Sequence, residues 1–283
     1  MNKVFRRLFR NRITYSFYKW LLWRQIKDGP KPEHVGLILD GNRRWAADHG
    51  LQVWAGHKAG ADKIEAVLDW CWKLGVKSVT VYAFSIENFS RSKQEVEEIM
   101  RIFEIKFKKI LEDERIHRNK IHIKIIGQID LLPNPVRYLI HKVEEATKDY
   151  NQFYLNIALA YGGRTELVEA MRKIAYEVRN DVISPELIDE NIMEKHLYTA
   201  YLPKSDLDIL IRTSGEERLS NFLLWQSAYT ELLFLDVFWP DFRCIDLWRA
   251  IRTFQRRRRN SSKKVSAMPK LILFLGILIK VIS

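Results

Sequence analysis

Six short apolar runs alternate along this sequence with longer segments of helical period. The runs are dense in Val, Ile, Leu and Tyr without strict alternation, which is typical of strands covered on both faces. They are His34–Asp40, Ser78–Phe84, Ile121–Gly127, Tyr154–Tyr161, Leu207–Thr213 and Glu231–Asp236. Helices are predicted at 56–74, 92–111, 134–150, 164–180, 185–197 and 241–257. This order predicts a single α/β domain, in which a mainly parallel six-stranded sheet is flanked by helices.

The charge separates a central domain from two basic ends. Residues 1–30 carry eight Lys and Arg against one acid, and residues 249–283 carry ten with no acid. Because the whole chain has a net charge of +12 and these ends supply +17, residues 31–248 are left at −5. We therefore predict a folded domain over 31–257, a basic aromatic segment over 1–30, and a basic, then apolar tail over 258–283.

The basic ends favour an anionic membrane surface as a partner and not a nucleic acid, whose binders carry a basic face within the folded domain. The nine apolar or glycine residues over 271–279 are too few to cross a bilayer, which takes about 20. Beside the basic run they suit insertion into a membrane interface, as does the first segment with Trp20 and Trp23. Since no signal-peptide core is present, we expect a cytoplasmic protein that is peripheral on the cytoplasmic face of the membrane.

Polar side chains cluster where several predicted strands end. The first strand ends in Asp40-Gly41-Asn42-Arg43-Arg44-Trp45, the second runs into SIENFSRS over 85–92, and the fifth into IRTSGEERLS over 211–220. In parallel sheets, ligands bind outside the carboxyl ends of the strands. Guanidinium groups suit phosphate oxygens because their donors are planar and permanently charged. The clusters predict a site for more than one phosphate group.

Two carboxylates could hold a metal ion in such a site. Asp40 stands among cations and should be ionised, and Glu231 begins the sixth strand. Mg²⁺ takes oxygen ligands and bridges phosphate oxygens. Taken singly, Arg and Asp residues at loop starts are usually solvated or form weak surface pairs. Their recurrence at successive strand ends is what favours a site.

Signature loops of other enzyme classes are absent from the sequence. It contains no G-x-x-x-x-G-K-[ST], no G-x-G-x-x-G and no H-E-x-x-H, so P-loop, dinucleotide-binding and zinc-protease sites lack their motifs. No G-x-S-x-G elbow exposes a serine nucleophile. The aspartate-rich D-D-x-x-D run of trans-prenyltransferases is missing as well.

Six longer motifs follow one another along residues 34–257. They are LDGNRRWA, GHKAGA, VTVYAFSIENFSRSKQEV, LNIALAYGGRTE, DILIRTSGEERLSNFLLWQ and ELLFLDVFWPDF. Their content and order resemble the cis-prenyltransferases, also called undecaprenyl or polyprenyl diphosphate synthases. SIENF and RTSGE are closest in style to archaeal and eukaryotic members. The resemblance identifies residues 31–257 as the catalytic domain.

The resemblance implies a Mg²⁺-dependent transferase of isoprenoid biosynthesis. Such an enzyme condenses isopentenyl diphosphate units onto an allylic diphosphate primer, farnesyl or geranylgeranyl diphosphate, and each addition makes a Z double bond. The product would be a long-chain polyprenyl diphosphate, the precursor of a glycosyl carrier lipid. Most one-component members are homodimers, and the resemblance implies a homodimer here. In this family the product lies in a tunnel between the sheet and two helices, here about 56–74 and 92–111, with Met100, Phe103 and Phe107 as candidate wall residues.

The resemblance also assigns roles to individual residues. Asp40 would handle Mg²⁺ and the leaving diphosphate, Glu231 would complete the metal's ligands, and Asn88 holds the position assigned to proton acceptance. The implied substrate-binding residues are Gly41, Asn42, Arg43, Arg44, Trp45, His57, Ser85, Ile86, Glu87, Phe89, Arg91, Arg212, Arg218, Leu219 and Ser220. Among them, Arg212, Arg218 and Ser220 would hold the isopentenyl diphosphate, and the residues after Asp40 would hold the primer.

Two positions depart from the family pattern. The family often has an Arg four residues before its motif His, where this chain has Val53. Catalytic subunits commonly end in an R-x-G motif, whereas this chain reads FQRRRRNSSKK. The second departure leaves an alternative open: a subunit of a heteromeric cis-prenyltransferase that needs a partner's C-terminal tail.

Overall fold

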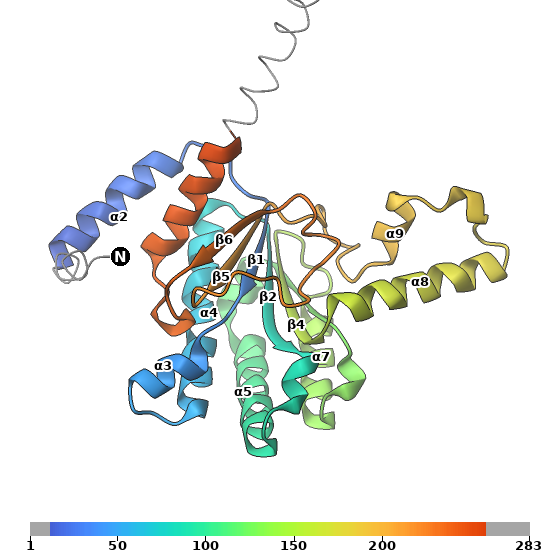
Figure 1. The fold of residues 1–283 in the computed structure, drawn as a ribbon, viewed down its shortest axis with the longest axis horizontal. Helices are drawn as coiled ribbons and strands as arrows, with labels where there is room; N and C mark the ends of the chain where they lie inside the picture. Colours follow the sequence, from blue (N-terminus) through green and yellow to red (C-terminus); the bar gives the residue numbers. More distant parts are fainter. Residues whose placement is uncertain (1–11, 259–283) are drawn as a thin grey trace, which may run out of the picture. The chain divides into compact units, whose positions relative to one another are not determined.

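The computed structural model describes residues 12–258, and a six-stranded sheet organises most of them (Figure 1). Its strands are β1 (His34–Ile38), β2 (Ser78–Ser85), β3 (Ile121–Ile126), β4 (Phe153–Tyr161), β5 (Ile209–Thr213) and β6 (Glu231–Leu235). They lie in the order β3-β4-β2-β1-β5-β6, and every neighbouring pair is parallel. The predicted α/β class is confirmed, and a sheet predicted to be mainly parallel is parallel throughout.

Helices connect the strands near the predicted positions. They are α3 (Asn42–Asp48), α4 (Val53–Leu74), α5 (Lys93–Glu112), α6 (Glu114–Arg118), α7 (Asn134–Thr147), α8 (Gly163–Arg179) and α9 (Glu190–His196). The short α3 and α6 were not predicted, because neither is long enough to show an apolar stripe. The helix predicted at 185–197 is divided: a single 3₁₀ turn, η3 (Pro185–Leu187), precedes α9. Asp189 caps the start of α9, since its side chain accepts a hydrogen bond from the amide of Ile192.

The two faces of the sheet pack against different partners. Side chains alternate along a strand, so neighbours in β2 point to opposite faces. Val81 and Ala83 line a cavity with residues of α4 and α5, whereas Tyr82 belongs to a core cluster with Phe222 and Leu223. On the first face α4 contacts α5 and α5 contacts α7, and the three helices lie side by side in Figure 1. The connection between β5 and β6 closes the opposite face.

The described residues fall into two compact units, one of which spans 32–242 and contains the sheet. The other unit contains α2 (Arg12–Ile26) and a helix over 244–258. Within it, the rings of Trp23 and Trp248 lie 5.2 Å apart, and Gln255 Nε2 donates to the carbonyl of Ile26 over 2.9 Å. The sequence did not predict α2, because charged residues interrupt every apolar run of that segment.

The terminal segments bear on two of the sequence predictions. Among residues 12–258, no helix is both long enough and apolar enough to cross a membrane. The apolar run over 271–279 and the region where an R-x-G motif would stand lie outside the described residues, so the structure does not test either prediction.

Candidate active site

A polar cleft of about 600 Å³ opens where β1, β2 and β5 end. Many of the predicted catalytic and substrate-binding residues line it together: Asp40, Asn42, His57, Ser85, Glu87, Asn88, Arg91, Arg212, Arg218 and Ser220. An adjoining hollow of about 550 Å³ shares Asp40, Asn42, His57 and Arg91 and adds Gly41, Arg43, Arg44 and Val53. The fold thus gathers strand-end residues that are up to 180 positions apart in the sequence.

Asp40 stands two residues beyond the end of β1 and is held from three sides. Its Oδ2 accepts a 2.7 Å hydrogen bond from Arg212 Nη2, its Oδ1 accepts one of 2.7 Å from the Gly41 amide, and Arg44 Nη2 lies 3.5 Å from Oδ1. Burial raises the pKa of the Asp40 carboxyl group, but hydrogen bonds from Arg212 and Gly41 and the charges of Arg212 and Arg44 lower this pKa by more than burial raises it. Asp40 therefore has a pKa below its ordinary value and is ionised at neutral pH.

Two glycines allow the backbone to approach closely around this carboxylate. Gly41 has a φ of +102°, and a Cβ there would lie 2.7 Å from Cδ1 of Phe238. A Cβ on Gly56 of α4 would lie 2.1 Å from the carbonyl oxygen of Asn42, so α3 and α4 pack backbone to backbone. That contact fixes the start of α3, whose Asn42 lines the cleft. Asn42 Oδ1 is buried there without a hydrogen-bond partner among the described residues.

Arg212 links the ends of β1 and β5. Its side chain is only 4% exposed, and besides Asp40 it donates from Nη1 to Ser220 Oγ over 2.7 Å and to the Arg218 carbonyl over 2.5 Å. Arg44 reaches the same loop from α3, since its Nη2 donates to Ser214 Oγ over 2.6 Å. The loop after β5 is therefore fixed by two guanidinium groups that also contact Asp40.

Glu95 of α5 contacts a histidine and two arginines on the other side of the cleft. Its Oε1 lies 3.0 Å from His57 Nε2, 3.1 Å from Arg91 Nη1 and 3.8 Å from Arg43 Nε. Burial lowers the pKa of His57, and the charges of Arg91 and Arg43 lower it further against the opposing effect of Glu95. Sequence analysis missed Glu95 because the pattern Ser92-x-x-Glu95 is an ordinary helix start, and Ser92 does cap α5.

The turn after β2, η1 (Ile86–Ser90), presents an amide and a carboxylate to the cleft. Asn88 Oδ1 accepts a 3.2 Å hydrogen bond from the Ser85 amide, in a reciprocal cap with the Ser85 side chain. Glu87 Oε1 accepts a 3.2 Å hydrogen bond from Asn221 Nδ2. Asn221, which also lines the cleft, was not predicted; its only sequence signal is its place beside Ser220.

Four predicted substrate-binding residues lie outside the walls of both hollows. Trp45 donates from its indole nitrogen to Asp241 over 3.0 Å and packs its ring on His49. Phe89 packs edge-on against Phe84, with the ring centroids 4.9 Å apart. Leu219 packs against the core cluster, and Ile86 lies near Gly162. In this structure the four support neighbouring elements instead of lining the hollows.

Glu231 lies away from Asp40. It begins β6 and pairs with Ile209, whereas Asp40 follows Ile38, which pairs with Arg212. At about 3.3 Å per residue, Glu231 is thus several residues down the sheet from the carboxyl ends. The two predicted metal-binding carboxylates do not come together within one chain, because Glu231 starts its strand and Asp40 follows the end of its own.

The donor set nevertheless suits a magnesium ion that arrives with a diphosphate. Within residues 12–258 no three His, Cys, Asp or Glu side chains gather into a metal-binding group. Mg²⁺ commonly binds through one or two carboxylates together with substrate phosphates and water, and does not require an all-protein cage. Asp40 supplies such a carboxylate, ionised and beside several guanidinium groups.

Comparisons with known proteins agree on one family. Residues 38–262 match the family model described as "Putative undecaprenyl diphosphate synthase". A tritrans,polycis-undecaprenyl-diphosphate synthase (geranylgeranyl-diphosphate specific) of Methanopyrus kandleri is 53% identical over 246 residues, 87% of this chain and 90% of that protein. The protein of the same description from Methanocaldococcus jannaschii is 49% identical over 92% of both chains.

A solved structure shows the same fold with a related substrate. Lavandulyl diphosphate synthase from Lavandula x intermedia, in complex with dimethylallyl diphosphate, superposes with a TM-score of 0.77 at 37% identity, over 80% of this chain and 95% of that one. The matched family model includes the strand ends that build the cleft. The chain therefore belongs to the undecaprenyl diphosphate synthase family and is a cis-prenyltransferase, an enzyme that condenses isopentenyl diphosphate with an allylic diphosphate.

Proposed function

We propose that this enzyme extends geranylgeranyl diphosphate with isopentenyl diphosphate, in a Mg²⁺-dependent reaction, to a long-chain polyprenyl diphosphate with Z double bonds. Such a product would be the precursor of a glycosyl carrier lipid. The observation that carries the proposal is the ion pair of Asp40 and Arg212 at the junction of two cationic groups in one cleft. The archaeal relatives, named as geranylgeranyl-diphosphate specific, favour this primer over farnesyl diphosphate.

The two cationic groups suit two diphosphates. The primer diphosphate would lie beside Gly41, Asn42, Arg43 and Arg44, where the hollow next to Asp40 is open. The isopentenyl diphosphate would lie on the other side, at Arg212, Arg218 and Ser220. As the C–O bond of the primer breaks, negative charge builds up on its diphosphate, and preorganised cations stabilise that charge. A bound Mg²⁺ held by Asp40 would add Lewis-acid neutralisation of the same group.

Proton removal would complete each addition. The new C–C bond forms between the primer's allylic carbon and the isopentenyl double bond, and a proton then leaves the isopentenyl unit. Asn88 is our candidate for this step; its side chain lines the cleft and accepts a hydrogen bond from the Ser85 amide. One lone pair of its Oδ1 remains available after that hydrogen bond. An amide is a weak base, so the proton would pass on to a diphosphate oxygen or water.

A primer comparison tests the proposed substrate. Purified enzyme with Mg²⁺ and radiolabelled isopentenyl diphosphate receives geranyl, farnesyl or geranylgeranyl diphosphate, and mass spectrometry gives the product lengths. We expect the highest kcat/KM with geranylgeranyl diphosphate, and no product when a chelator removes Mg²⁺. Faster turnover of farnesyl diphosphate would contradict the primer assignment, and undiminished turnover with chelator would contradict the metal requirement.

We further propose that the enzyme works as a homodimer. Activity of the purified chain by itself, at a sedimentation mass twice that of one chain, is the expected result. A chain that is folded but inactive until a second protein is added would instead support the heteromeric alternative, in which a partner supplies the missing C-terminal motif.

The exposed face of α2 suits an anionic membrane. Phe17 is 62% exposed and Trp20 48%, and with Leu21 and Arg24 they follow the helical spacing of three and four residues. The rings of Phe17 and Trp20 stack at 5.8 Å, and the Arg24 guanidinium lies 4.9 Å from the Trp20 ring centroid. Aromatic residues beside cations are the pattern of helices that lie in a membrane interface.

Replacing Phe17 and Trp20 together by Ser should weaken binding to anionic vesicles by about tenfold or more, because two large aromatic side chains no longer enter the interface. Sedimentation with phosphatidylserine-containing vesicles measures the effect. Tyr176→Ser/Tyr229→Ser is the control, since these two exposed aromatic residues lie in the other unit. Equal binding of both double variants would exclude this face as the membrane contact.

A further inference from the structure

A second cavity of about 110 Å³ lies between α4, α5 and the sheet. Its walls are mainly apolar and include Leu68, Val81, Phe107, Ile110, Leu155 and Ile157. Ala61, Ile64, Ala83 and Phe103 line both this cavity and the polar cleft, so the two spaces adjoin. An apolar space next to a diphosphate site suits the hydrocarbon tail of the growing chain.

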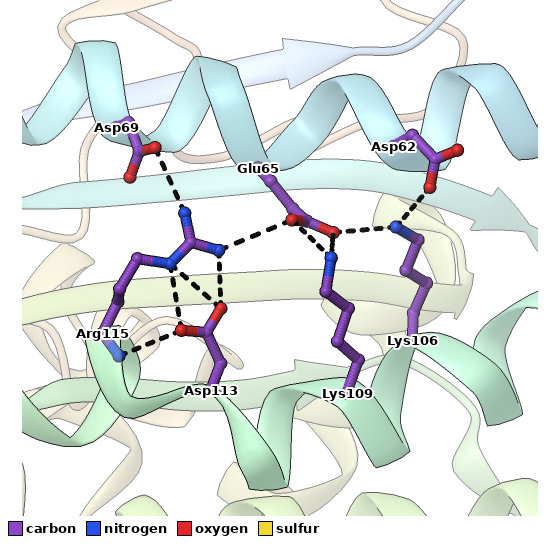
Figure 2. A network of polar contacts seen from close by, with 7 residues as sticks. All are labelled: Asp62, Glu65, Asp69, Lys106, Lys109, Asp113 and Arg115. Atoms are coloured by element: carbon purple, nitrogen blue, oxygen red, sulfur yellow. Dashed lines mark hydrogen bonds and ion pairs between the residues drawn. The ribbon is translucent and has the colours of Figure 1, made fainter.

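A network of ion pairs joins α4 to α5 at this cavity, as Figure 2 shows. Carboxylates of α4 point toward the cations Lys106 and Lys109 of α5 and Arg115 of α6. We call this network the α4–α5 clasp; its members are Asp62, Glu65, Asp69, Lys106, Lys109, Asp113 and Arg115. All of them except Asp62 also line the cavity, so the clasp forms its polar rim.

Glu65 is the centre of the clasp. Its Oε1 accepts hydrogen bonds of 2.8 Å from both Lys106 and Lys109, and its Oε2 lies 3.5 Å from Arg115 Nη2. Lys106 Nζ also reaches Asp62 over 2.6 Å, and Arg115 Nη1 reaches Asp69 over 3.3 Å. Isolated surface pairs contribute little to stability, but several charges in one network contribute more.

The charges of the clasp persist at neutral pH. Burial raises the pKa of Glu65, but hydrogen bonds from Lys106 and Lys109 lower it more. Burial lowers the pKa of Lys106, and hydrogen bonds to Asp62 and Glu65 raise it more. Both groups therefore stay ionised, and the attraction between the helices depends on the salt concentration.

The cavity is too small for a long product. About 110 Å³ leaves room for only a short stretch of hydrocarbon between α4 and α5, so a longer chain lodged there would push the two helices apart. We propose that the α4–α5 clasp resists this separation and thereby limits the length of the polyprenyl product. The inference rests on the proposed elongation activity. Each added CH₂ that stays out of water favours a longer chain in the cavity, and the stretched ion pairs oppose it.

Neutralising the centre of the clasp tests the proposal. Glu65→Gln keeps the shape of the side chain and removes the charge that three cations share. With geranylgeranyl and isopentenyl diphosphates, mass spectrometry should show a product distribution shifted to longer chains by at least one isoprene unit. Lys109→Gln, which removes one cation from the same centre, should shift the distribution in the same direction. If Glu65→Gln does not fold, the product distribution of Lys109→Gln tests the proposal instead.

Salt provides a second measurement that a purely structural role would not affect. Between about 0.1 M and about 1 M NaCl the Debye length falls from ~10 Å to ~3 Å. The wild-type products should lengthen over this range, and those of Glu65→Gln should change less. Glu97→Gln is the matched control: Glu97 also pairs with a lysine, but within α5 alone, at 3.9 Å from Lys93 Nζ, and its products should match those of the wild type.

The outcomes separate the two proposals. If the wild type makes polyprenyl diphosphate and the products of Glu65→Gln and Lys109→Gln have the wild-type length or are shorter, the clasp does not limit chain length. A lower rate with unchanged product length would likewise overturn the inference and leave only a structural role. If the wild type itself makes no polyprenyl product from these substrates, it is the proposed function that fails.

Discussion

Asp40→Ala is expected to lower kcat/KM for isopentenyl diphosphate by on the order of 10³-fold, because it removes the carboxylate that lies among the arginines of the cleft and would hold a Mg²⁺-diphosphate. It also leaves Arg212 without its 2.7 Å partner, so the guanidinium can pair directly with substrate phosphate. We therefore expect the larger loss in kcat and a smaller change in KM. Assays with radiolabelled isopentenyl diphosphate over a range of Mg²⁺ concentrations measure both constants.

Two further variants make this result specific. Asp40→Asn preserves the shape of the side chain and should be nearly as inactive, since the charge is what matters. Asp48→Ala removes an exposed carboxylate at the end of α3 and should keep wild-type turnover, provided that the loss is specific to Asp40. Circular dichroism must show that all three variants are folded. Turnover of Asp40→Ala within tenfold of the wild type would exclude the proposed role.

The position of Asp40 could be predicted because parallel strands place their carboxyl ends at one edge. That rule alone brings Asp40, Arg212 and Ser220 together from distant parts of the sequence. The same rule does not bring Glu231 to this edge of the sheet, because Glu231 stands at the start of its run. The position of Glu231 relative to Asp40 depends on the register of β6 in the sheet. Apolar runs without strict alternation do not specify which residues pair, so the sequence did not give that register.

Other features of the site could not be predicted from the sequence, because they depend on contacts that form only when the elements pack. Glu95 looked like a helix-cap residue, and only packing between α4 and α5 brings His57 next to it. Trp45 and Phe89 belong to motifs full of site residues, yet the sequence cannot show which way a ring points. In this structure both pack against protein neighbours. The ion pairs of the α4–α5 clasp were not predicted either, because the sequence does not show which charged residues on two helices will face each other.

Arg212→Lys is expected to reduce kcat/KM by on the order of 10²-fold, although the charge is retained. The guanidinium fork contacts Asp40, Ser220 and the Arg218 carbonyl at once, whereas an ammonium is a point charge on a flexible stem. Because the side chain is 4% exposed, the broken contacts should also cost about 2 kcal/mol of unfolding free energy. Urea denaturation measures the stability, and steady-state kinetics with isopentenyl diphosphate measures the activity.

A surface exchange of the same kind provides the control. Arg137 forms a 2.6 Å ion pair with Asp130, whose side chain is 91% exposed, so Arg137→Lys should leave activity unchanged and stability within about 0.5 kcal/mol of the wild type. The double variant Arg212→Lys/Asp40→Asn then shows whether Asp40 and Arg212 act in catalysis as one unit or independently of each other. Groups that act as a unit are strongly non-additive, so the double variant should be little worse than Asp40→Asn alone. Multiplied losses would mean that Arg212 holds its diphosphate independently of Asp40, and that the ion pair between them is not the functional unit of the cleft.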